Sequence, residues 1–176
     1  MKINKNKIFC KLFFFRKRIS FFILMFKTMS VIGSFGPWAM AAIIVTENII
    51  NEDTYFKIGL LLLWQPLNIT INGLLKEIIN EDRPDGSMHV NKLEALIDEG
   101  TKGMPSGHAQ LVGSELALAF LSNTTIVTRT IMTIQTGLTV YQRWLYKKHS
   151  IMQLVIGLWI GMLYSFIFWF WFSSLN

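Results

Sequence analysis

The sequence has few of the residues that build soluble or disulfide-rich proteins. Only 16 % of its 176 residues are charged, below the roughly 25 % that is usual for soluble domains. A single cysteine, Cys10, excludes a framework of disulfides within the chain. No spacing of cysteines and histidines matches a zinc site, so we expect no metal and no cofactor. The shortage of charge points instead to a membrane protein.

Hydrophobic residues make up 52 % of the chain, with 14 Phe and 6 Trp among them. A membrane-spanning helix needs ~20 mainly apolar residues, and several segments approach that length. They are Met29–Thr46, Ile58–Leu75, Gly107–Leu121, Ile126–Tyr141 and Ile151–Phe172. We therefore predict an all-α fold, a polytopic membrane helical bundle with about five transmembrane helices.

The last of these segments carries a glycine pair that is typical of helix packing in membranes. Gly157 and Gly161 form a GxxxG spacing, which lets two helix backbones approach closely. One interpretation of this pair is a homo-oligomer formed through the last helix.

Basic side chains are concentrated at the N-terminus. Residues 1–27 contain eight of the 17 basic residues and none of the 11 acidic ones. We assign residues 1–28 to a basic, aromatic interfacial arm and residues 29–176 to a membrane-embedded domain. The arm either contacts the headgroups of anionic membrane lipids or is a solvated tail that only sets topology. We expect no binding to nucleic acid, because the rest of the chain is lipid-like.

Three polar blocks lie between the hydrophobic segments, namely Lys76–Pro84 (KEIINEDRP), Met104–His108 (MPSGH) and Arg143–Gln153 (RWLYKKHSIMQ). An even number of membrane crossings separates the second block from the third, so all three share one membrane face. Cations in the blocks can offset charge on phosphoryl oxygens, and catalysis of phosphoryl transfer depends mostly on positioning and electrostatics. The blocks predict a phosphate pocket at the membrane surface.

The first block contributes two cations. Lys76 and Arg83 are seven residues apart, a spacing that places both on one face of a helix, and Pro84 is expected to end that helix. Arginine can grip a phosphate by a bidentate fork and lysine as a point charge. The alternative is that both side chains snorkel at a helix end.

The second block is predicted to begin a helix. Ser106 is suited to cap it, and Gly107 lets a backbone N–H approach an anion closely. His108 follows at the mouth of the helix. The alternative is an ordinary helix cap with an incidental histidine.

The third block places Arg143 and His149 in the turn between the last two segments. Gln153 comes one helical turn after His149, so it can accept a hydrogen bond from one imidazole nitrogen and leave the other directed at the pocket. The alternative is that Arg143, Lys147 and Lys148 anchor the turn at the membrane surface.

The order of these motifs resembles the signature of the type 2 phosphatidic acid phosphatase and haloperoxidase family, over about half of the chain. The motifs are Lys-x6-Arg-Pro, then Pro-Ser-Gly-His, then Arg-x5-His. The resemblance implies that His149 is a nucleophile that becomes phosphorylated and that His108 protonates the leaving oxygen. It further implies a metal-independent reaction. The implied phosphate-binding residues are Lys76, Arg83, Ser106, Gly107 and Arg143.

Two positions depart from the general family pattern. Gln142 stands where a serine is usual, and Gln153 stands where an aspartate usually orients the nucleophile. A neutral amide stabilises an imidazolium less than a carboxylate does. The Gly103–Ser106 run, Gln110 and Gln153 are nevertheless similar to the dolichyldiphosphatase branch, in which this glutamine is normal.

That branch implies hydrolysis of a polyprenyl (dolichyl-type) diphosphate to the monophosphate. Two alternatives stay open. One is a broader lipid phosphate phosphatase of the phosphatidic acid type, and the other is a catalytically silent membrane protein that binds lipid phosphates.

Orientation in the membrane also stays open. The basic arm favours a cytosolic N-terminus, which with five spans places the three blocks in the cytosol. The resembling dolichyldiphosphatases act on the luminal face of an internal membrane such as the endoplasmic reticulum, and a span over residues 8–26 would turn the blocks to that face. Glycosylation at Asn123 would place the pocket in the cytosol.

Overall fold

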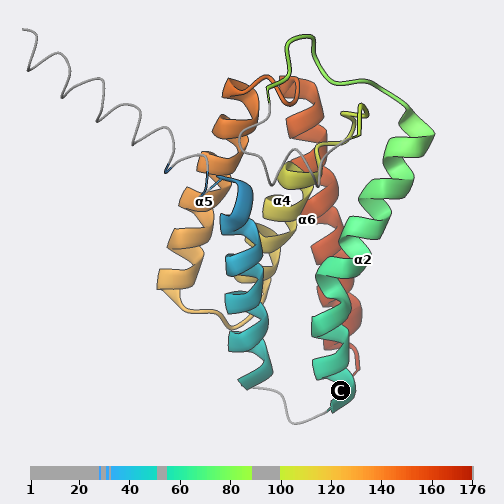
Figure 1. Cartoon of the computed structure of the whole chain (residues 1–176). Coiled ribbons are helices and arrows are strands. Elements are labelled where there is room, and N and C mark those ends of the chain that lie inside the picture. Colours follow the sequence, from blue (N-terminus) through green and yellow to red (C-terminus); the bar gives the residue numbers. More distant parts are fainter. Residues whose placement is uncertain (1–27, 29–30, 32, 51–54, 89–99, 176) are drawn as a thin grey trace, which may run out of the picture.

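The structure is a computed structural model that describes residues 28, 31, 33–50, 55–88 and 100–175. Long helices form a bundle (Figure 1): an N-terminal helix over residues 33–50, α2 (Tyr55–Ile79), α4 (Gly107–Leu121), α5 (Ile126–Leu145) and α6 (Ile151–Ser173). The described residues form no strand beyond an isolated bridge between Asp82 and Lys102. The all-α prediction is therefore confirmed. Residues 1–27 of the expected interfacial arm lie outside the described residues, so the arm and its lipid contacts stay predictions.

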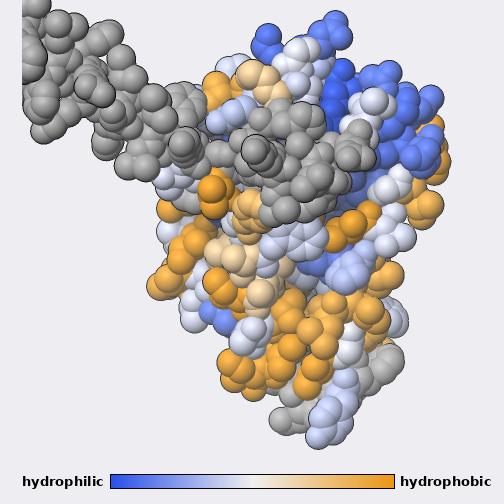
Figure 2. Space-filling model, viewed as in Figure 1, coloured by the Kyte–Doolittle hydropathy of each residue, from blue (hydrophilic) through white to orange (hydrophobic). Residues whose placement is uncertain are grey.

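The surface of the bundle is divided by polarity. Figure 2 shows hydrophilic residues gathered at the end where α2 terminates and α5 turns into α6, and mainly hydrophobic residues over the opposite half. Large apolar side chains face outward there, among them Phe166 at 57 % and Phe170 at 74 % exposure. A soluble monomer rarely exposes so large an apolar surface. Two helices, Lys57–Ile79 and Ile151–Ser173, are long and apolar enough to cross a membrane.

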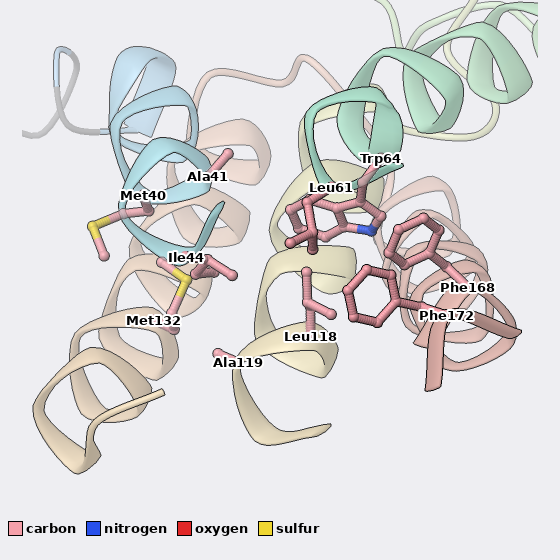
Figure 3. Packing of buried hydrophobic residues seen from close by; sticks show 10 residues of the cluster. All are labelled: Met40, Ala41, Ile44, Leu61, Trp64, Leu118, Ala119, Met132, Phe168 and Phe172. Carbon is pink, nitrogen blue, oxygen red and sulfur yellow. The ribbon is translucent and has the colours of Figure 1, made fainter. Parts of the chain in front are cut away.

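A hydrophobic core joins the N-terminal helix, α2, α4, α5 and α6 in the half of the bundle away from the polar blocks. Trp64 of α2 is fully buried at its centre, beside Leu118 of α4 and Phe168 and Phe172 of α6 (Figure 3). The Trp64 indole N–H donates to Ser165 Oγ at 3.0 Å, so its one polar atom is satisfied. This core holds the helices whose other ends carry the polar blocks.

The helices α4 and α6 pack closely, and glycine makes the approach possible. A Cβ on Gly157 would lie 2.6 Å from the Ser106 carbonyl oxygen, and one on Gly161 would overlap the Gln110 carbonyl oxygen. The GxxxG pair therefore packs inside the chain against α4. A homo-oligomer stays a prediction, but these glycines are not free to form its interface.

The helix α2 ends earlier than the sequence predicted. Its last residue is Ile79, and Asn80 follows with a φ of 54°, a left-handed conformation that asparagine adopts more readily than most residues. The Asn80 N–H donates to the Lys76 carbonyl at 2.9 Å and closes the helix. The prediction that Lys76 and Arg83 share one face of a helix ended by Pro84 was therefore wrong, because Arg83 lies beyond the helix.

Candidate active site

The segment after α2 pairs with the segment before α4. The Arg83 N–H donates to the Thr101 carbonyl at 3.0 Å, and the Gly103 N–H donates to the Glu81 carbonyl at 2.7 Å. These bonds flank the bridge between Asp82 and Lys102. The first polar block is thereby fixed to the residues that lead into the second.

The second block is in turn fixed to the third. The Ser106 N–H donates to the Gln153 carbonyl at 3.1 Å. At Gly103 a Cβ would lie 2.7 Å from both terminal atoms of the Gln153 side chain, so only glycine leaves room for this amide. The three blocks therefore meet at one end of the bundle, as the count of membrane crossings predicts.

The Gln153 amide is held at both ends, and its contacts define which atom is oxygen. Its Oε1 accepts from the Ser150 N–H at 3.2 Å, while its Nε2 donates to Glu81 Oε1 at 2.7 Å and to the Asp82 carbonyl at 2.9 Å. A flipped amide would face a donor with its NH2 group and two acceptors with its oxygen. The His149 Nδ1 lies 3.2 Å from the same Oε1, so Nδ1 must carry the proton. His149 Nε2 therefore keeps its lone pair.

His149 lies in the turn between α5 and α6 and is 4 % exposed. Its pKa is lowered from 6.5 to about 3, first by burial and then by the positive charges of Arg83, Lys76 and Arg143, whereas the hydrogen bond to Gln153 acts in the opposite direction. Since the charged form is disfavoured, the imidazole is neutral at physiological pH. The site thus places a neutral imidazole with a free Nε2 among three cations.

Buried cations surround this turn. Arg143 is 1 % exposed, and its Nη2 donates to Ser34 Oγ of the N-terminal helix at 3.3 Å. The Lys148 side chain is fully buried, and its backbone N–H donates to the Arg143 carbonyl at 3.0 Å. A membrane-surface anchor keeps its charged end in water, so Arg143 and Lys148 do not fit the anchor alternative.

Ser106 and Gly107 begin α4 as predicted. Ser106 is the N-cap, and its side-chain oxygen accepts from the Ala109 N–H at 3.4 Å. The N-terminus of α4 therefore lies in the segment that is hydrogen-bonded to Gln153. Free N–H groups and the helix dipole favour an anion at such a terminus.

His108 borders a small cavity of about 120 Å³ between α2 and α4. Its other lining residues are Trp38, Asn68, Ile69, Asn72, Gly107, Gln110 and Leu111. The amides satisfy one another's donors: Asn72 Nδ2 donates to Gln110 Oε1 at 2.8 Å, and Gln110 Nε2 donates to Asn68 Oδ1 at 2.8 Å. One of the three amide oxygens is left over, since Asn72 Oδ1 accepts no hydrogen bond from the described residues.

Comparison with known proteins identifies the family of the chain. The sequence model of the PAP2 superfamily matches residues 56–176, more than half of the chain. The chain belongs to the PAP2 superfamily. Its structure is similar to that of a transmembrane PAP2 type phosphatidylglycerolphosphate phosphatase from Bacillus subtilis, with a TM-score of 0.63, 20 % identity, and coverage of 86 % of this chain and 77 % of that chain. A search of curated protein sequences found no match.

The PAP2 assignment confirms the family resemblance and the polytopic membrane bundle. The chain is a membrane protein with the fold of a PAP2-type lipid phosphatase, a class of hydrolases. The blocks Lys76–Pro84, Met104–His108 and Arg143–Gln153 all lie within the matched residues. Among the described residues, no group of three or more histidine, cysteine, aspartate or glutamate side chains is placed to hold a metal ion.

The sequence reasoning missed several residues that the structure brings to this PAP2 site. Glu81 meets Gln153 across 72 positions of sequence, and no spacing rule signals such a contact. Ser34 reaches Arg143 from a helix that precedes the matched residues. At the position of the usual serine, Gln142 packs against Gly33 of the same helix. Only Glu81 carried a signal, because it lies within the first polar block.

Proposed function

We propose that this PAP2 protein hydrolyses a polyprenyl diphosphate of the dolichyl type to the monophosphate and inorganic phosphate, through a phosphohistidine at His149. One observation carries the proposal: the hydrogen bond from His149 Nδ1–H to Gln153 leaves Nε2 free on a neutral imidazole. A neutral imidazole with a free lone pair is a competent nucleophile toward phosphorus.

The proposed reaction has two steps. His149 Nε2 attacks the terminal phosphorus, the bond to the bridging oxygen breaks, and His108 gives its proton to that leaving oxygen. Lys76, Arg83 and Arg143 offset the charge on the phosphoryl oxygens. Water then attacks the phosphohistidine with His108 as the base, and His149 leaves as the neutral imidazole.

The N-terminus of α4 completes the proposed phosphate site. Gly107 supplies a backbone N–H group at that terminus and Ser106 supplies its hydroxyl proton, since the Ser106 N–H is already bonded to the Gln153 carbonyl. In the proposed site these groups bind phosphoryl oxygens without a metal ion. We place the enzyme in the endoplasmic reticulum or another internal membrane, where the lipid chain of the substrate remains in the bilayer.

The cavity beside His108 favours a second candidate, a broader lipid phosphate phosphatase that acts on monoesters. The leaving group must lie next to the acid that protonates it. The acceptor oxygen of Asn72 suits a leaving group with hydroxyl donors better than a second phosphate, which carries only acceptors at neutral pH. A glycerol headgroup is such a leaving group, and the similar Bacillus subtilis structure is named for a glycerophosphate lipid.

Phosphate release from purified protein in detergent tests both candidates. We would supply a polyprenyl diphosphate, phosphatidic acid or phosphatidylglycerolphosphate, with EDTA present, and compare the native chain with His149→Gln. The proposal expects fastest release from the polyprenyl diphosphate and none in the variant. Faster release from a monoester would select the second candidate, and turnover by His149→Gln would exclude His149 as the nucleophile. Binding of vanadate without turnover of any lipid would select the silent binding protein.

A further inference from the structure

The hydrogen bond between Gln153 and Glu81 has the geometry of a charged interaction. Gln153 Nε2 lies 2.7 Å from Glu81 Oε1, shorter than the 2.9–3.0 Å that is most common for N–H···O bonds and within the range of bonds to ionised acceptors. The opposite end of the same amide accepts from His149 Nδ1 at 3.2 Å. A carboxylate and the proposed nucleophile are thus joined through a single amide group.

We propose that Glu81 is a positioning residue for His149, and that it supplies through Gln153 the negative charge that an aspartate supplies directly in the general family pattern. The proposal rests on the function proposed above. An anion that accepts from an amide N–H draws positive charge toward nitrogen and leaves more negative charge on the amide oxygen. Gln153 Oε1 then holds the His149 Nδ1–H more strongly, above all when the imidazole becomes positively charged on attack.

The backbone keeps Glu81 in this position independently of its side chain. Its carbonyl accepts from the Gly103 N–H at 2.7 Å, and Gln153 Nε2 also donates to the next carbonyl, that of Asp82. The acid of Asp82 is directed elsewhere, since Lys102 Nζ lies 3.1 Å from Asp82 Oδ1. Replacing the Glu81 carboxylate therefore changes the charge beside Gln153 without removing the pairing of the two segments.

Because Glu81 is exposed, solvent screens its charge and the effect should be partial. We expect Glu81→Gln to lower kcat by about 10-fold, the lower end for residues that act through a ligand or nucleophile, with little change in KM. The matched control is Glu77→Gln, which removes the same charge from an exposed position of α2 and should leave kcat unchanged. An unchanged kcat in Glu81→Gln, or an equal loss in the control, would overturn the proposal.

A swap of the two groups gives a sharper test. Gln153→Glu alone places a second carboxylate against Glu81, and their repulsion should lower kcat more than Glu81→Gln does. In the double variant Gln153→Glu with Glu81→Gln, the amide and the carboxylate exchange places, and kcat should rise above that of Gln153→Glu alone. A further fall in the double variant would refute the proposed transfer of charge.

A spectroscopic measurement separates this proposal from the proposed function. In the native chain the Nδ1 proton of His149 should give a downfield 1H signal, which moves upfield in Glu81→Gln and is unchanged in Glu77→Gln. This measurement needs no turnover. A lack of phosphate release would count against the proposed function, whereas an unmoved signal in Glu81→Gln would count against the role of Glu81.

Discussion

At the scale of single residues, His149 sets the pH behaviour of the site. Its pKa is lowered from 6.5 to about 3, so between these values an unfolded chain binds a proton here and the folded chain does not. Stability therefore falls as pH drops through this window and is fully present above it. We predict that His149 stays neutral at pH 5, which 15N NMR of the histidines can check, with His149→Gln to assign the signal. A protonated ring at pH 5 would contradict the buried, cation-flanked site.

A second prediction at this scale concerns Gly103. A Cβ there meets the Gln153 amide, whereas a Cβ at Gly100 meets nothing within 4 Å. Gly103→Ala should displace the amide from Glu81 and His149 and lower kcat by about 10- to 100-fold. Gly100→Ala is the control and should retain the native rate. Equal rates in the two variants would show that Gln153 does not need its present position.

At the scale of helices, the pair α4–α6 carries the site, because Ser106 and Gln153 lie at their adjoining N-terminal ends. Gly161→Ala would bring a methyl group against the Gln110 backbone, and we expect a loss of about 1–3 kcal/mol, typical of overpacking. The same change at Gly137 of α5 meets open space and should be harmless. Thermal unfolding in detergent compares the two, and an equal Tm would contradict the close packing.

The predictability of each helix depended on where its boundary signals lie. The bounds of α4 were predicted correctly, since a serine cap and an apolar run are local features. The end of α2 was predicted incorrectly, because the left-handed Asn80 stops it before Pro84. Of two side-chain partners of Gln153, His149 was predicted and Glu81 was not. His149 precedes Gln153 by four residues, one turn at the start of a helix, whereas the contact with Glu81 depends on how three distant segments pack. Contacts of that range have no periodic signature in a sequence.

At the scale of the whole molecule, the bundle has two chemically distinct ends. The polar blocks lie at one end, and the turn between α4 and α5, with the exposed Asn123, follows the far end of α4. We predict that Met88→Cys and Asn123→Cys, each in a Cys10→Ser background, react with a membrane-impermeant maleimide from opposite sides of sealed vesicles. Labelling of both from the same side would contradict the membrane bundle.

The contact between Ser34 and Arg143 bears on how much of the chain the reaction needs. The N-terminal helix precedes residues 56–176. The hydroxyl group of its Ser34 nevertheless reaches Arg143, a buried arginine that is proposed to bind phosphate. A protein trimmed to residues 56–176 would open that arginine to water and remove one of its neighbours. The catalytic unit would then begin upstream of residue 56, and truncations or domain grafts that begin at that residue should yield a weakened enzyme.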